Sequence, residues 1–192
     1  MRLLPLLFLV PALVGCRSRD AATPAEAHAR LAAAVATHDG ARLWGAIDEE
    51  TRWSWMSVQR AWREAYDITL SVVPEGPERN RLLARFEAGA TSEDARSLFE
   101  RMLRPEDWSR LQALLAAAGS RRPEMPASGT TSEIVTPAGP LLYRKGQSQH
   151  SGWGYAGLAS RAEQIKFSAT ADLERMRKDA ADYESAATRG RT

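Results

Sequence analysis

Residues 159–188 read ASRAEQIKFSATADLERMRKDAADYESAAT and carry a long regular apolar pattern. Apolar or small residues recur there at alternating steps of three and four, which places them on one face of a helix. This seam consists of Ala162, Ile165, Ala169, Leu173, Met176, Ala180, Tyr183 and Ala187. It predicts a long C-terminal helix that packs along other helices, with an oligomer contact as the alternative. We favour packing within the chain, because alanine at several seam positions weakens an isolated coiled coil.

Residues 23–119, which precede the seam, have the signals of several short helices that bury their faces on one another. Thr23-Pro24-Ala25-Glu26 spells a capping box with proline at the first helical position. Asp48 is placed to cap an amphipathic helix at about 49–70, where apolar residues recur at helical spacing. The sequence therefore predicts a helical bundle in this part of the chain.

The second half of this bundle is expected to contain three more helices. Gly89 is a plausible C-terminal cap for the first of them, and Thr91 or Ser92 is expected to open the second. Pro105 opens the third, which carries apolar residues up to a glycine at position 119. Residues 120–130 are rich in proline and small residues and are expected to form a linker.

The periodicity changes after this linker. Three strand-like runs, at 131–136, 141–145 and 153–158, are separated by turn-rich segments, so we expect a small antiparallel β-meander. So few strands need support from helices to be stable. The predicted fold is mostly α with a small antiparallel β-meander, an α+β arrangement in one domain at 23–188 followed by a short tail at 189–192.

Composition and charge exclude several classes of protein. The chain has 192 residues, 44% of them hydrophobic, with 26 basic and 24 acidic residues and a formal net charge of +2. These fractions are typical of globular proteins and not of collagen-like, wholly disordered or multi-span membrane chains. The charge balance provides no large basic field, so we expect no nucleic-acid partner.

Residues 1–15 have the features of a signal peptide. Arg2 gives a short basic start, and an apolar run follows from Leu3 to Val14, interrupted by Pro5 and Pro11. Twelve residues are too few to span a bilayer, which requires about 20. The run therefore predicts an export signal and not a permanent transmembrane helix.

The end of this run, Leu13-Val14-Gly15-Cys16, resembles the lipobox of bacterial lipoproteins. The resemblance implies that Cys16 receives a diacylglycerol, that a peptidase cleaves before it, and that residues 16–22 form a lipidated tether. It also implies a location in the cell envelope, with the membrane as partner. Arg17 is not the aspartate typical of inner-membrane retention, so we expect the outer membrane, on its periplasmic side. An ordinary signal peptide with a chance cysteine is the alternative.

No recognisable catalytic set, metal site or cofactor motif is found in the sequence. His28, His38 and His150 are the only histidines, and they lack the spacing of a metal site. The chain has no Gly-x-Ser-x-Gly motif, and Cys16, the only thiol, is assigned to lipid. Clustered acidic residues lie at the starts of predicted helices, where carboxylates interact favourably with the helix dipole. We therefore expect no cofactor and no catalytic residue.

Two aromatic groups are candidates for ligand or partner contact. Trp53 lies 200° around the helix from Trp55, so one of the two faces away from the core. The exposed one could cover a neighbouring helix, line a groove or touch lipid headgroups. The second group is the glycine-rich loop with Gln149, His150, Trp153 and Tyr155, whose side chains suit a polar ligand site. For both groups, ordinary packing is the alternative interpretation.

Two functional hypotheses follow. The first is a non-enzymatic, lipid-anchored envelope lipoprotein that binds a partner protein or has a structural role. The second is a small-ligand-binding protein with weak enzymatic potential, because the early helices, with Asp39 and Trp44 opening a short second helix, resemble the start of nuclear transport factor 2-like (NTF2-like) domains. That resemblance implies a long curved sheet around a pocket. The strand-like segments here are short, and the chain closes with a long helix, so we rank this hypothesis second.

Overall fold

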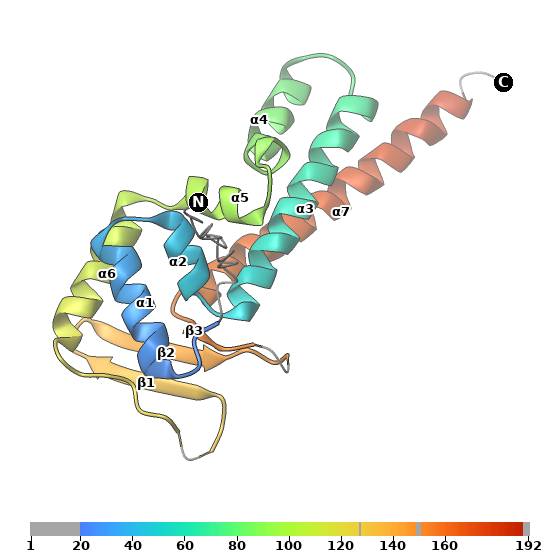
Figure 1. The fold of residues 1–192 in the computed structure, drawn as a ribbon. Coiled ribbons are helices and arrows are strands. Elements are labelled where there is room, and N and C mark those ends of the chain that lie inside the picture. The colour runs from blue at the N-terminus through green and yellow to red at the C-terminus, as the bar shows by residue number, and fades with distance from the viewer. Residues whose placement is uncertain (1–19, 127, 149–150, 190–192) are drawn as a thin grey trace, which may run out of the picture.

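A computed structural model describes residues 20–126, 128–148 and 151–189 and confirms the mostly helical α+β fold (Figure 1). Its helices are α1 (Pro24–Ala36), α2 (Gly40–Ala46), α3 (Glu49–Val72), α4 (Pro77–Thr91), α5 (Ala95–Met102), α6 (Pro105–Ala118) and α7 (Ala159–Arg189). Its strands are β1 (Thr131–Thr136), β2 (Gly139–Lys145) and β3 (Trp153–Tyr155). The predicted signal peptide, Cys16, Gln149, His150 and residues 190–192 lie outside the described residues.

Short polar side chains begin most of the helices, as the sequence predicts for two of them. The side chains of Thr23, Asp39 and Asp48 each accept a hydrogen bond from a backbone N–H in the first turn of α1, α2 and α3, respectively. Such caps satisfy donors that have no partner inside a helix. For α5, Asp94 has this role, accepting from the N–H of Ser97 at 2.7 Å. The expectation that Thr91 or Ser92 opens this helix is therefore wrong, because the carboxylate two or three residues later is the cap.

Gly89 does not end a helix, which corrects a second expectation. It lies inside α4 and faces α3, where a Cβ at its position would overlap the Cβ of Trp62. The glycine is thus needed for the close approach of two helices and not for a left-handed terminal turn. Sequence alone does not separate these two uses of glycine.

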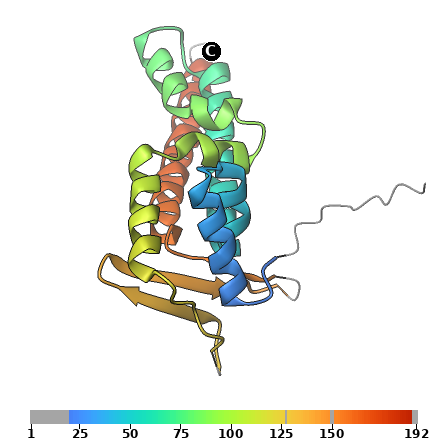
Figure 2. The ribbon, with the colours of Figure 1, turned by 60° about the vertical axis from the view of Figure 1, so that its left-hand side comes forward.

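The sheet has the order β1-β2-β3 and is antiparallel throughout. Glu133 pairs with Leu142, and Tyr143 pairs with Tyr155. The third strand ends at Tyr155 and not at Leu158, because the chain turns there into α7, with the N–H of Ala159 bonded to the carbonyl of Ala156 at 3.0 Å. Helices α1 and α6 pack on the sheet, which lies at one end of the molecule (Figure 2).

The predicted seam of α7 packs mainly on α3, which runs parallel to it (Figure 1). Ala162, Ala169, Leu173 and Met176 are buried in this contact, whereas Tyr183 is 46% exposed. The 31-residue α7 is longer than the 24-residue α3, so its last turns extend past the end of its partner. The side chain of Ala187 lies outside the description. Packing within the chain therefore accounts for the first half of the seam.

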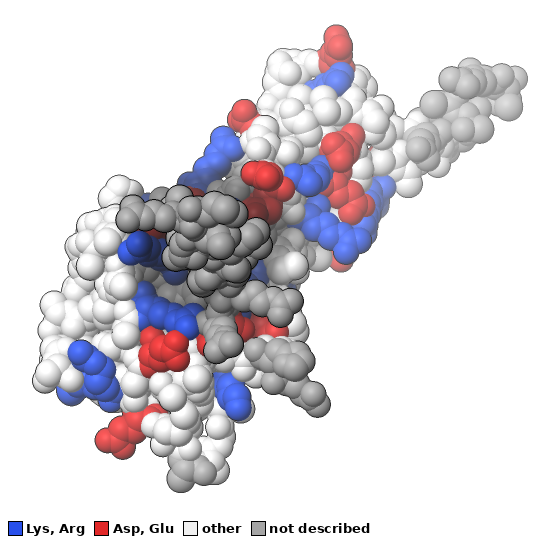
Figure 3. Space-filling view, viewed as in Figure 1, with Lys and Arg blue, Asp and Glu red and all other residues white. Residues whose placement is uncertain are grey.

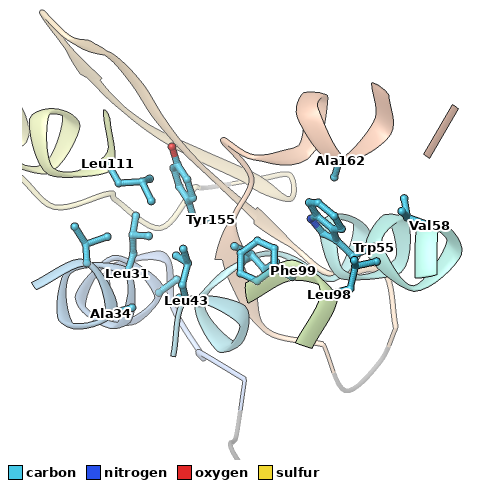
Figure 4. Packing of buried hydrophobic residues seen from close by; sticks show 14 of the residues in the cluster. Leu31, Ala34, Leu43, Trp55, Val58, Leu98, Phe99, Leu111, Tyr155 and Ala162 are labelled. Carbon is cyan, nitrogen blue, oxygen red and sulfur yellow. The ribbon is translucent and has the colours of Figure 1, made fainter. Parts of the chain in front are cut away.

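One hydrophobic cluster joins the helices to the sheet. Phe99 of α5 lies at its centre, between Leu43 of α2 and Trp55 of α3 (Figure 4). Its ring contacts those of Trp44 and Trp55, with centroid distances of 5.5 and 5.7 Å. Among the described helices, none is both long enough and apolar enough to cross a membrane.

Candidate functional site

Among the predicted contact residues that the structure describes, Trp53 is the one on the surface. It lies in the second turn of α3 and is 51% exposed, whereas Trp55, two residues later, is 3% exposed and packs in the core. The two residues point in different directions, as their 200° separation on a helix requires. Met56, one turn after Trp53, is 53% exposed, so the two form an apolar pair on the outer face of α3.

Trp153 and Tyr155 are core residues, which corrects the expectation that their side chains line a polar ligand site. They are 6% and 2% exposed, and the ring of Tyr155 lies 5.9 Å from that of Tyr143. Burial raises the pKa of Tyr155 to about 12. The packing alternative thus applies to both rings, while Gln149 and His150 of the same loop lie outside the described residues.

The loop between β2 and β3 lies against the start of α3, about 100 residues away in the sequence. Glu49 accepts hydrogen bonds from the backbone N–H groups of Gln147 and Ser148, at 2.9 and 3.5 Å. Ala21 is held at the edge of β3, where its carbonyl accepts from the N–H of Trp153 at 2.8 Å. Three segments that are far apart in the sequence therefore meet at one place.

Asp20 also belongs to this place. Its carboxylate pairs with Arg52 of α3 at 3.5 Å and accepts from the N–H of Gly152 at 3.4 Å. We call this region the N-terminal corner, formed by residues 20–21, the first two turns of α3 and loop residues 146–148 and 151–152. The chain enters the described structure here, where Asp20 contacts Arg52, the residue before Trp53.

A buried ion pair lies beneath the N-terminal corner. Asp48 is 2% exposed, caps α3 and has its Oδ2 2.9 Å from Arg144 Nε, while Arg144 also pairs with Glu50. Burial raises the pKa of the Asp48 carboxyl, against the opposing effects of Thr51 and Arg144. The distance between Asp48 Oδ2 and Arg144 Nε is short, but the two groups are not oriented for a hydrogen bond. Among the described residues, these two atoms and Thr51 Oγ1 are buried without a hydrogen-bond partner.

This carboxylate has the raised pKa of a general acid, but its position favours a structural role. Asp48 lies in the α2–α3 connection and is 2% exposed, and Gly154 of β3 packs so closely on it that a Cβ at Gly154 would lie only 2.5 Å from the Asp48 backbone. Asp48 joins the start of α3 to the sheet, since its own N–H donates to the carbonyl of Tyr155 at 3.1 Å. These contacts let Asp48 position the corner.

The two described histidines have separate environments. His28 is buried, with its Nδ1 2.6 Å from the hydroxyl of Tyr143, and burial lowers the pKa of its imidazole, with Arg122 acting in the same direction. His38 lies just after α1, stacked edge-on against Trp108 at 5.3 Å. Within the described residues, no group of three His, Cys, Asp or Glu side chains is placed to hold a metal ion.

A groove follows the outer face of α3 away from the N-terminal corner. It has a volume of about 560 Å³ and is lined by Met56, Gln59, Arg60, Arg63, Glu64 and Asp67 of α3 and by residues 93–95. At this groove the side chain of Arg63 donates a hydrogen bond to the carbonyl of Ser92 at 2.7 Å. Charges of both signs line this groove, and both signs are interspersed over the face of the molecule in Figure 3.

A second hollow, which the sequence analysis missed, opens between α1, α2 and α5. It has a volume of about 580 Å³, and Trp44 lines it together with Arg30, Arg42 and Arg96. In the sequence these arginines are separated by 12 to 66 positions, and nothing local marks them as a group. The nearest signal is Arg42 beside Trp44, with small residues on either side.

Comparison with known proteins adds no family to this geometry. A scan against protein-family models, a search of curated proteins and a search of solved structures each found no match to the chain.

Proposed function

We propose that this chain is a lipid-anchored lipoprotein of the cell envelope, held by Cys16 on the periplasmic side of the outer membrane. The Leu13-Val14-Gly15-Cys16 motif carries the proposal. The position of Asp20 supports it, because contacts with α3 and the sheet begin only four residues after the lipidated cysteine, within the segment 16–22 expected to be a tether. The end of the tether is fixed by hydrogen bonds and an ion pair, and it lies on the surface at the N-terminal corner.

The tether length determines which part of the domain faces the bilayer. Four residues of fully extended chain span at most about 14 Å. A lipid on Cys16 therefore keeps the N-terminal corner, including Arg52 and Trp53, next to the membrane surface. The groove on α3 then leads away from the bilayer, over about 17 Å between Met56 and Asp67 at 1.5 Å per residue.

The role of the anchored domain is non-enzymatic: it binds a protein partner in the envelope through the outer face of α3. Trp53 and Met56 provide exposed apolar anchors of the kind that dominate protein interfaces. The same groove is lined by two arginines and by the carboxylates of Glu64, Asp67, Glu93 and Asp94. An anionic lipid surface would repel these carboxylates, whereas a protein segment can pair with both signs, so the groove fits a protein better than a bilayer.

The anchor is tested by processing and partition of the full chain in cells that lipidate proteins. The wild-type protein should enter the detergent phase, and its mass should show loss of residues 1–15 and gain of acyl chains. Cys16→Ser should leave an unprocessed chain or one in the aqueous phase. Equal partition of the two proteins, or a mature N-terminus without lipid, would overturn the anchor.

The partner surface is tested by placing a photo-crosslinking residue at Met56 in the native envelope. We expect a protein adduct that disappears when Trp53→Ala is added, because loss of an interface tryptophan weakens binding by roughly 30-fold or more. The same residue at Val135, which is 69% exposed on the sheet, is the matched control. Adducts with phospholipid at Met56, or protein adducts that do not depend on Trp53, would contradict a protein partner on this face.

A further inference from the structure

The hollow between α1, α2 and α5 exists because its lining includes very small residues. Ala33 of α1 and Ala41 and Gly45 of α2 line it, and a Cβ added to Gly45 would meet nothing within 4 Å. The space of about 580 Å³ is in the range of small-molecule sites. This hollow is separate from the α3 groove, whose lining shares no residue with it.

Three guanidinium groups reach the hollow from three different helices. Arg30 pairs with Glu26 at 2.6 Å, Arg42 with Asp39 at 3.2 Å and Arg96 with Glu100 at 3.7 Å. Among the described lining residues there are three arginines and no carboxylate, and the carboxylate partner of each arginine lies outside the lining. The three ion pairs are partly or largely exposed, and such pairs contribute little, so an arginine can exchange its partner for a ligand anion at small cost.

Trp44 provides an apolar wall beside these charges. The indole is half-buried and is supported from the core by Phe99, whose ring lies 5.5 Å away at an angle of 53°. A tryptophan held on one side by packing loses little freedom when a ligand covers its remaining surface. An aromatic ring, small residues and guanidinium groups that line one hollow suit a ligand with an apolar part and an anionic group.

We infer that this hollow binds an amphipathic anion, a small molecule with a planar or short aliphatic body and one carboxylate or phosphate group. The apolar body lies against Trp44 above Gly45, and the anionic group accepts hydrogen bonds from Arg42 and Arg96, since guanidinium groups match the geometry of both anions. The ligand could be a free aromatic acid or an alkyl phosphate derived from lipid. This inference does not depend on the lipid anchor or on the α3 groove.

The test uses the full chain in nanodiscs of neutral lipid and calorimetric titration with 2-naphthoate and hexyl phosphate. Tighter binding of the first would indicate an aromatic acid, and tighter binding of the second a lipid-derived phosphate. Arg42→Gln and Arg96→Gln should each weaken the tighter probe about tenfold, since each removes a charge-assisted hydrogen bond. Arg81→Gln, on the exposed surface of α4, is the matched control and should leave binding unchanged.

Gly45→Leu tests the space itself, because its side chain should fill the hollow and abolish binding. If that variant loses its helical circular dichroism signal, Ala33→Leu fills the hollow from α1 instead, at an exposed position. The inference is overturned if neither probe binds, if inorganic phosphate binds as tightly as hexyl phosphate, or if a folded filling variant binds as well as wild type. Loss of anchoring in Cys16→Ser does not change the binding expected in the hollow. The lipid-anchor proposal and the ligand-site inference can therefore be overturned independently.

Discussion

The two ends of the molecule are built by different means. The base, which consists of α1, α2, α6 and the sheet, joins residues far apart in the chain through buried polar contacts, such as His28 with Tyr143. The arm, which consists of α3, α4 and α7, is held by helix faces in close contact and by exposed ion pairs such as Arg177 with Glu64 (Figures 1 and 2). The base should therefore respond to pH, and the arm to the size of side chains at helix contacts.

Phe99→Ala should have the largest effect on stability, because this ring touches both ends. Its neighbours Trp44 and Trp55 belong to α2 of the base and α3 of the arm. Truncation of a buried aromatic residue lowers the free energy of unfolding by about 4 kcal/mol. Urea denaturation measures the change, and Trp53→Ala, at an exposed site on the same helix as Trp55, should change stability by less than about 0.5 kcal/mol. Equal losses in the two variants would show that Phe99 does not join the two ends.

Gly89→Ala should act on the arm alone. The added Cβ overlaps Trp62, so α3 and α4 must separate, at a cost of about 2 kcal/mol for overpacking. Gly45→Ala is the matched control in α2, where open space surrounds the new methyl group and helix propensity favours alanine by roughly 0.5–1 kcal/mol. Hydrogen exchange should show faster opening of α4 in the first variant, with the sheet unchanged. A stabilised Gly89→Ala protein would mean that the helices are not in close contact there.

The same contrast explains what could be predicted from the sequence. The helices of the arm have periodic apolar patterns in the sequence. The α7 seam from Ala162 to Met176 and the different orientations of Trp53 and Trp55 could therefore be predicted from the sequence. The base depends on pairs separated by about 100 residues, such as Asp48 with Arg144, which no local pattern contains.

The errors had the same origin. Gly89 has the local features of a helix end, and only the presence of Trp62 across the helix contact shows otherwise. Trp153 and Tyr155 were assigned to a ligand loop because α1 and the α2–α3 connection, which cover them, could not be placed. The hollow lined by Arg30, Arg42 and Arg96 could not be predicted, because it forms only where three helices pack together.

His28 should make the base sensitive to acid. Its folded-state pKa is lowered, so the stability it contributes is complete above its unfolded pKa of about 6.5 and is lost as pH falls toward the lower folded value. The slope for one proton is at most about 1.4 kcal/mol per pH unit. Asp48, with its raised pKa, acts in the opposite direction, since its contribution is lost as pH rises through that folded value.

His28→Gln isolates the histidine effect, because the amide can keep a hydrogen bond to Tyr143 but does not titrate. The free energy of unfolding of this variant should fall less than that of wild type between pH 7 and pH 5. His38→Gln, on the exposed surface, should retain the wild-type slope. If the His28→Gln protein keeps the full slope as well, the acid sensitivity lies elsewhere in the base.

The smallest effect is expected at the ion pair between Arg177 of α7 and Glu64 of α3. The Arg177 Nε lies 2.8 Å from Glu64 Oε1, but both side chains are more than one-third exposed. Solvent-exposed pairs contribute about 0.5 kcal/mol or less, and salt screens them. A double-mutant cycle with Arg177→Gln and Glu64→Gln should therefore give a small coupling energy that vanishes in high salt. A coupling several times larger would mean that charge, and not the fit of the α3 and α7 faces, holds the arm together.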